Sequence, residues 1–118
     1  MRDEYKAELE SFQHEGDEDC IGLWQVIAIV NRILGLKTFS LSAPDSNKSL
    51  QATMEFVQLM LRNGFVAVDM EGQGGYKAWP DQDPTIVTQR IKNEWIRLKG
   101  AQPDIGFIVW FNKVDKAP

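Results

Sequence analysis

The sequence contains few of the residues on which metal centres, thiol enzymes and membrane proteins depend. It has a single cysteine, Cys20, and a single histidine, His14. One cysteine cannot form an internal disulfide, which fits a reducing compartment. No stretch reaches the roughly 20 apolar residues that span a bilayer, and the N-terminal residues lack the apolar core of a secretion signal. We therefore expect a cytoplasmic protein that makes no contact with membranes.

The densest group of reactive side chains is the stretch HEGDEDC, residues 14–20. A zinc site needs three or four ligands, so His14 and Cys20 would have to recruit carboxylates. Asp17 and Asp19 match two positions of a calcium-binding EF-hand loop, but apolar residues occupy later positions that need oxygen ligands. Neighbouring carboxylates also oppose formation of a reactive thiolate at Cys20. The stretch predicts neither a metal site nor a catalytic cysteine.

Two further patterns superficially resemble functional sites, one a phosphate-binding loop and the other a catalytic carboxylate pair. The loop EGQGG, residues 71–75, has the spacing G-x-G-G and is expected between two strands, whereas a phosphate-binding loop opens a helix. We therefore expect a hairpin turn and no cofactor. Asp69 and Glu71 would share one face of a strand, about 7 Å apart, which leaves room for both to ionise. A small enzyme that uses Asp69 and Glu71 stays open as an alternative, although we expect no enzymatic activity.

The acidic charge is concentrated at the N-terminal end. The whole chain has a net charge of −4, but residues 1–20 contain eight acids and two bases, a net of −6. The other 98 residues contain nine acids and eleven bases, a net of +2. Such a field repels nucleic acids and attracts basic proteins.

The hydrophobic pattern predicts one compact α+β domain over residues 1–118. Tyr5, Leu9 and Phe12 form one helical stripe, and FVAVDM has the alternation of a strand. In chain order we expect helices at 3–13 and 19–34, a helix between a cap at Ser46 or Asn47 and a stop at Asn63-Gly64, strands at 65–70 and 76–79, a helix from Pro84 to about Lys99, and a strand at 105–111. The order is α-α-α-β-β-α-β, with a small antiparallel sheet.

The two ends of the chain are expected to lie outside the core of this domain. Residues 1–16 are expected as a peripheral helix, and the sequence leaves open whether they pack on the domain. Residues 112–118 are expected as a polar tail. The last strand, IGFIVWF, is apolar on both faces and is therefore expected in the interior of the sheet.

Four tryptophans are many for a chain of this length. Trp24, Trp95 and Trp110 fall on apolar stripes and are expected in the core, whereas Trp79, next to Pro80, is expected to be partly exposed. The fourth helix also carries a basic run: Arg90, Lys92, Arg97 and Lys99. Together with the hairpin, this run supports a second alternative, a winged-helix-like nucleic-acid-binding or regulatory module. The third helix has few basic residues, so nucleic acid is the less favoured partner.

Several runs of the chain together resemble a known class of small proteins. The runs DCIGLWQVIAIVNRIL, LMLRNGFVAVDM, KAW, NEWIRLKG and PDIGFIVWF, over residues 19–111, resemble the immunity proteins of bacterial contact-dependent growth inhibition and related polymorphic toxin systems. The resemblance implies a cytoplasmic, non-catalytic protein that binds the toxin domain of a cognate effector, often a basic nuclease, and covers its active site. It transfers no particular residues, because interfaces differ between cognate pairs.

The charge pattern agrees with such a partner. Carboxylates can occupy the phosphate sites of a cationic cleft, and an exposed aromatic side chain can serve as an anchor. We therefore expect a 1:1 complex with a basic toxin domain. The expected contact residues are Glu15, Asp17, Glu18, Asp19, Asp69, Glu71 and Trp79.

Overall fold

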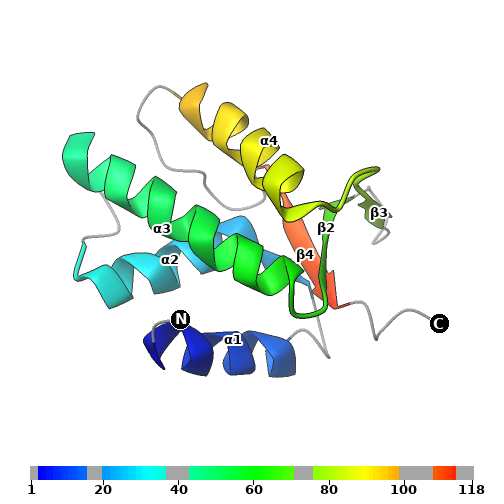
Figure 1. Cartoon of the computed structure of the whole chain (residues 1–118), viewed down its shortest axis with the longest axis horizontal. Coiled ribbons are helices and arrows are strands. Elements are labelled where there is room, and N and C mark those ends of the chain that lie inside the picture. The colour runs from blue at the N-terminus through cyan, green and yellow to red at the C-terminus, as the bar shows by residue number, and fades with distance from the viewer. Residues whose placement is uncertain (1–2, 16–19, 37–42, 71–75, 99–107, 114–118) are drawn as a thin grey trace.

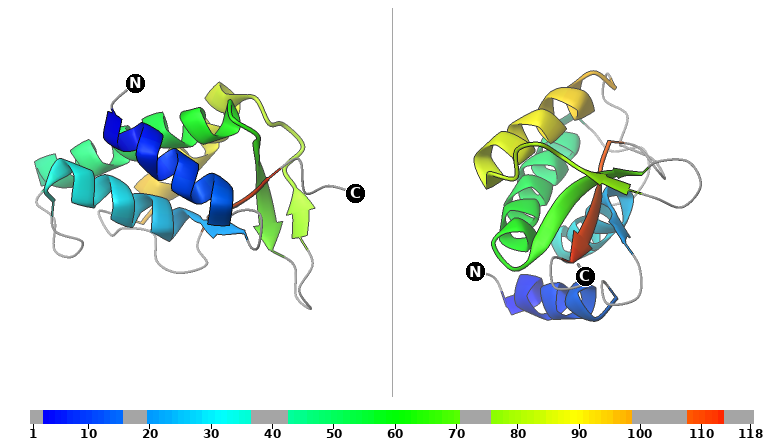
Figure 2. Two further views of the ribbon diagram at one scale, coloured as in Figure 1. Left: turned by 90° about the horizontal axis from the view of Figure 1, so that it is seen from below. Right: turned by 90° about the vertical axis from the view of Figure 1, so that its right-hand side faces the viewer.

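The computed structural model describes residues 3–15, 20–36, 43–70, 76–98 and 108–113, and these form an α+β fold (Figure 1). The elements are α1 (Asp3–Glu15), β1 (Ile21–Gly22), α2 (Leu23–Leu34), α3 (Ala43–Leu61), β2 (Phe65–Met70), β3 (Tyr76–Ala78), α4 (Pro84–Ile96) and β4 (Trp110–Lys113). The predicted class and the predicted order are confirmed, with one addition, the two-residue strand β1. The helices gather on one side of the molecule and the sheet stands on the other (Figures 1 and 2).

The sheet is antiparallel and has the strand order β1-β4-β2-β3. The final strand is interior, as predicted, because β4 lies between β1 and β2. Its bounds differ from the predicted 105–111, of which residues 105–107 lie outside the described part of the chain. Asn112 and Lys113, assigned to the polar tail, belong to β4 and pair with Val66 and Phe65. Pairing uses the backbone groups, so polar side chains do not end a strand.

The start of the second helix was predicted wrongly. We expected it near residue 19, but α2 begins at Leu23 and its N-cap is Gly22. The backbone N–H of Gly22 donates to Oε1 of Gln25 at 2.7 Å. Ile21 is fully buried and pairs with Phe111 of β4. The sheet therefore takes the two residues that local pattern alone assigns to the helix.

Capping residues in the sequence predicted the start of one helix correctly and the start of another wrongly. Asp83 caps α4 as predicted, since its carboxylate accepts the N–H of Thr85 at 2.9 Å, and Pro84 occupies the first helical position. The helix α3 begins at Ala43, so Ser46 and Asn47 lie within it and do not cap it. The helix α4 ends at Ile96, short of the predicted end near residue 99.

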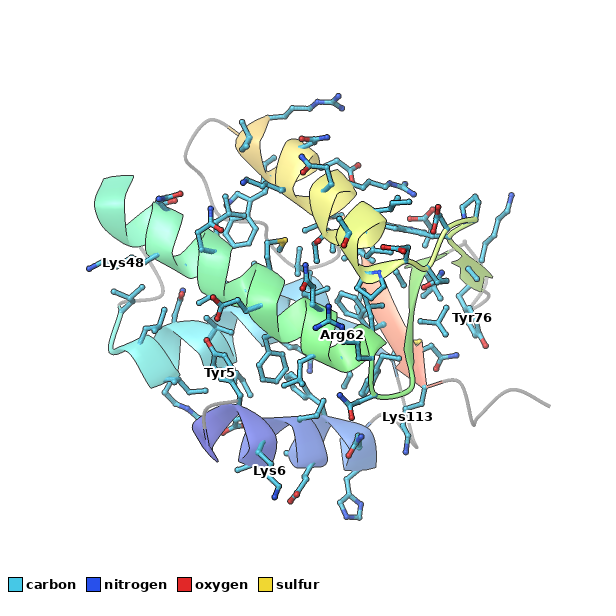
Figure 3. All side chains as sticks on the ribbon, in the orientation of Figure 1. Tyr5, Lys6, Lys48, Arg62, Tyr76 and Lys113 are labelled. Atoms are coloured by element: carbon cyan, nitrogen blue, oxygen red, sulfur yellow. The ribbon has the colours of Figure 1, made fainter. Side chains whose placement is uncertain are left out.

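The first helix packs on the domain, which answers the question that the sequence left open. Tyr5 and Phe12 both contact Phe56 of α3 edge to face, with ring centroids 5.3 and 5.7 Å apart. Figure 3 shows Tyr5 directed from α1 toward α3 and Lys6 directed away from the domain. The predicted stripe of Tyr5, Leu9 and Phe12 is buried. An ion pair between Glu8 and Arg32 of α2 adds a polar contact at the edge.

The helical layer also contains buried polar groups. Asn31 of α2 and Ser49 of α3 are both fully buried, and the hydroxyl of Ser49 donates to Oδ1 of Asn31 at 2.5 Å. A buried hydrogen bond of this kind fixes the lateral register of two packed helices, because either group would be costly to bury alone.

Candidate functional site

The indole of Trp79 lies at the junction between the hairpin and α4. Its side chain is only 3% exposed, so the prediction of a partly exposed tryptophan was wrong. The backbone N–H of Trp79 donates to the carbonyl of Ala67 at 2.9 Å, which extends the pairing with β2 beyond the end of β3. Its Nε1–H donates to Oδ1 of Asp69 at 2.9 Å. Sequence reasoning saw the adjacent Pro80 but not the helix that covers this ring.

The guanidinium of Arg90 stacks on the ring of Trp79. Its Cζ lies 3.7 Å from the ring centroid of Trp79, which is a cation–π stack. The same guanidinium lies 4.0 Å from Oδ2 of Asp69, through Nη2, and 3.7 Å from Oε2 of Glu94, through Nε. We call Asp69, Trp79, Arg90 and Glu94 the Trp79 cluster. It connects β2, the end of the hairpin and α4.

Gln82 completes the edge of the sheet beside this cluster. Its side-chain amide accepts the N–H of Ala67 at 2.8 Å and donates to the carbonyl of Ala67 at 2.9 Å. It also donates to the carbonyl of Trp79 at 2.9 Å. In a continued strand pair, the N–H of Ala67 would donate to the carbonyl of Trp79. The side chain of Gln82 bonds to both of these backbone groups instead. Sequence reasoning missed Gln82 and Glu94, because no local motif distinguishes them from solvated polar residues.

The structure describes one member of the proposed carboxylate pair, Asp69. Asp69 is bonded to Trp79 and paired with Arg90, so its oxygens already have structural partners. Glu71 lies outside the described residues. Asp69 therefore has a role in packing the hairpin against α4 that the enzyme hypothesis did not foresee.

The basic run of α4 is partly neutralised by its surroundings. Arg90 shares its charge with Asp69 and Glu94, while Arg97 is exposed. Lys92 is half-buried, and Lys99 lies outside the described residues. The described residues therefore give a dispersed positive face on α4 and not the dense basic strip expected of a recognition helix.

The predicted acidic contact residues are placed only in part. Glu15 is the last residue of α1, and Asp17, Glu18 and Asp19 lie outside the described residues. His14, one residue earlier, is exposed, and Cys20 is half-buried. Within the described ranges, no group of three histidine, cysteine or acidic side chains could hold a metal ion.

An open groove of about 530 Å³ runs along the outer face of α4. Its lining residues are Thr85, Ile86, Gln89, Arg90, Asn93, Glu94 and Arg97. Two of them, Arg90 and Glu94, also belong to the Trp79 cluster. The groove was not anticipated from the sequence, in which these positions are simply the polar side of an amphipathic helix.

Comparison of the chain with protein families, with curated proteins and with solved structures found no match. Among the described helices, none has both the length and the apolar character needed to cross a membrane. The charge, packing and surface of the chain itself are therefore the basis for a functional proposal.

Proposed function

We propose that this protein is an immunity protein, which neutralises a cognate basic toxin domain by binding over its active site. The observation that carries the proposal is the docking of α1 through Tyr5 and Phe12 onto Phe56. This docking holds α1, whose residues 3–15 contain five acids and one lysine, a net of −4, against the domain. A charged segment held in place loses less conformational entropy on binding than a free tail.

The mechanism is substitution of carboxylates for phosphates. A nuclease cleft is cationic because it binds a polyanion, and an acidic surface that enters the cleft excludes that substrate. Charges of opposite sign also steer the two proteins together and raise the association rate by roughly 10- to 1000-fold. On α1, Glu10 is exposed, whereas Glu8 is already paired with Arg32.

The residue proposed as the aromatic anchor changes from Trp79 to Tyr76. Trp79 is buried under Arg90 and is not offered as a contact residue. Tyr76 is 47% exposed on β3, where it pairs with Met70 next to Asp69. Figure 3 shows Tyr76 projecting outward from the hairpin. Tyrosine is a common anchor in interfaces, so Tyr76 takes the place of Trp79 in the proposal.

The direct test is co-expression with a toxin. The C-terminal domain of a large secreted effector encoded next to this gene would be induced in a sensitive host with and without this chain. The proposal expects growth only in the presence of the chain, and a purified 1:1 complex by size-exclusion chromatography with light scattering. Arrest of growth despite stable expression of both proteins would refute it.

A pair of matched variants tests the electrostatic part. Glu15→Gln with Asp17→Asn removes two charges from the acidic end, and Glu55→Gln with Asp81→Asn removes two exposed charges elsewhere. At low salt we expect the first variant to lower the association rate several-fold and the second to leave it within about twofold. Association that is insensitive to salt and equal in both variants would contradict steering by this segment.

A further inference from the structure

The outer face of α4 combines an exposed apolar side chain with two arginines. Ile86 is 51% exposed and lines the groove together with Arg90 and Arg97. These three residues are spaced four and seven positions apart, so they share one face of the helix. The opposite face is formed by Val87, Ile91 and Trp95, which are buried in the core. The residues of the outer face are therefore separate from those that pack in the core.

Arg90 is held in place before any partner arrives. The ring of Trp79 lies under its guanidinium, and Asp69 and Glu94 lie beside Nη2 and Nε. Among the described residues, these contacts involve Nη2 and Nε of the planar group and not its Nη1 donors. An arginine fixed by stacking loses little side-chain entropy when it binds a carboxylate.

The described part of the groove lining has a positive net charge, in contrast to the chain as a whole. Among the described residues, the charged lining consists of Arg90, Arg97 and Glu94, a net of +1, whereas the chain carries −4. The side-chain amide of Gln89 donates to Oδ1 of Asn93 at 3.0 Å, and both residues line the groove as neutral hydrogen-bonding groups. A partner that fits this surface must therefore bring negative charge and one apolar side chain.

We propose that the outer groove of α4 is a docking site for an acidic amphipathic helix of a partner protein. Arg97 can donate to a carboxylate in bidentate geometry, Arg90 can donate to a second carboxylate through Nη1, and an apolar side chain covers Ile86. Arg90 and Arg97 lie about two helical turns, roughly 10 Å, apart along the axis. In a parallel alignment the partner helix would carry an apolar residue followed by acids four and eleven positions later.

This site goes beyond the proposed function, because it takes a ligand of the opposite charge on a different element. Loss of toxin neutralisation in the variants of residues 15 and 17 would leave the α4 groove intact. Loss of peptide binding at α4 would likewise leave protection against a toxin unchanged. The two proposals can therefore fail separately.

The test uses fluorescein-labelled helical peptides and the full chain. One peptide carries leucine followed by glutamate four and eleven positions later, a second has the reversed order for antiparallel docking, and matched controls carry glutamine for both acids. By fluorescence anisotropy we expect one glutamate peptide to bind about tenfold more tightly than its glutamine control. No measurable binding of any glutamate peptide at about 1 mM protein would overturn the proposal.

Variants localise the site. Arg97→Gln should weaken binding of the glutamate peptide about tenfold, and Ile86→Ser should weaken binding of both glutamate and glutamine peptides. Arg62→Gln, at an exposed arginine that follows α3, is the matched control and should have no effect. Circular dichroism would show that each variant is folded, and Ile86→Ser serves if Arg97→Gln is not.

Two further measurements complete the test. Amide chemical shifts that change on addition of the glutamate peptide should lie along α4. Shifts that lie on α1 or α2 instead would overturn the proposal. A single-stranded oligonucleotide that binds more tightly than the peptide and displaces it from α4 would do the same, and would assign the two arginines to phosphate recognition.

Discussion

The indole N–H of Trp79 donates a hydrogen bond of 2.9 Å to Oδ1 of Asp69. The bond joins the segment after β3 back to β2, and Arg90 of α4 stacks on the other side of the ring. Sheet and helix therefore meet at one side chain. Both partners of the bond were singled out from the sequence as surface contacts, and the structure brings them together for packing.

Replacing Trp79 by phenylalanine should destabilise the fold. The substitution removes the bond to Asp69 and leaves space under Arg90, and we expect the free energy of unfolding to fall by about 2–3 kcal/mol. Urea denaturation followed by circular dichroism measures this. Tyr76→Phe, on the exposed neighbour, should change stability by less than about 0.5 kcal/mol. Equal midpoints for the two variants would show that this partly buried bond contributes nothing.

The stack of Arg90 on Trp79 should appear as a coupling energy. In a double-mutant cycle with Arg90→Met and Trp79→Leu, we expect an interaction of about 0.5–1 kcal/mol, because the arginine is partly exposed. The same cycle with Arg97→Met should give additive effects within about 0.5 kcal/mol, since Arg97 is not over the ring. If both cycles are additive, the stack does not stabilise the protein.

Removing the side chain of Phe12 should release α1 from the domain. Phe12 is 2% exposed and contacts Phe56 edge to face. A buried phenylalanine replaced by alanine costs about 3–5 kcal/mol when the whole fold depends on it. We expect Phe12→Ala to increase hydrogen exchange first in α1, and Ser11→Ala, on the exposed side, to leave it unchanged. Unchanged protection of α1 in Phe12→Ala would contradict the observed docking.

A methyl group at residue 22 should clash with the tryptophan that follows. A Cβ on Gly22 would lie 2.6 Å from Nε1 of Trp24 and 3.3 Å from the ring of Trp110. We expect Gly22→Ala to cost about 1–3 kcal/mol and to change the near-ultraviolet circular dichroism, because two indoles must move. Gly35→Ala is the comparison, since that site has φ +72° and nothing within 4 Å.

The comparison separates two causes of strain. Gly35→Ala should cost about 1 kcal/mol through its backbone alone, with the tryptophan spectrum unaltered. Gly22 has a φ of −82°, which alanine adopts readily, so any cost there comes from the side chains. A normal tryptophan spectrum in Gly22→Ala would show that the indoles are not packed as described.

Local chemistry was enough to predict several elements. FVAVDM alternates between two faces and forms β2 over the predicted residues, and Asp83 with Pro84 begins α4 as predicted. The stripe of Tyr5, Leu9 and Phe12 gave the inner face of α1. In each case the determining residues lie within two turns or one strand of each other, so the sequence carries the whole signal.

Some residues of the candidate site could be selected from the sequence, but the contacts between them could not be predicted. Asp69 and Trp79 were both selected for charge and aromatic character, and Arg90 was noted in a basic run. Their contact depends on the strand register that sets Asp69 opposite Lys77 and on the packing of α4 over the hairpin. Neither is visible in a single stretch of sequence, which is why a buried tryptophan was expected at the surface.

The sequence by itself determined the order of the helices and strands apart from β1, how the acidic charge is distributed and where α4 begins, because these follow from neighbours in the chain. Only the tertiary structure decided that Ile21 and Gly22 join the sheet, that α1 docks on Phe56 and that Trp79 is covered by Arg90. These three outcomes depend on residues at least 11 positions apart in the chain. Burial is a property of the folded surface as a whole, and the local pattern of polar and apolar residues only constrains it.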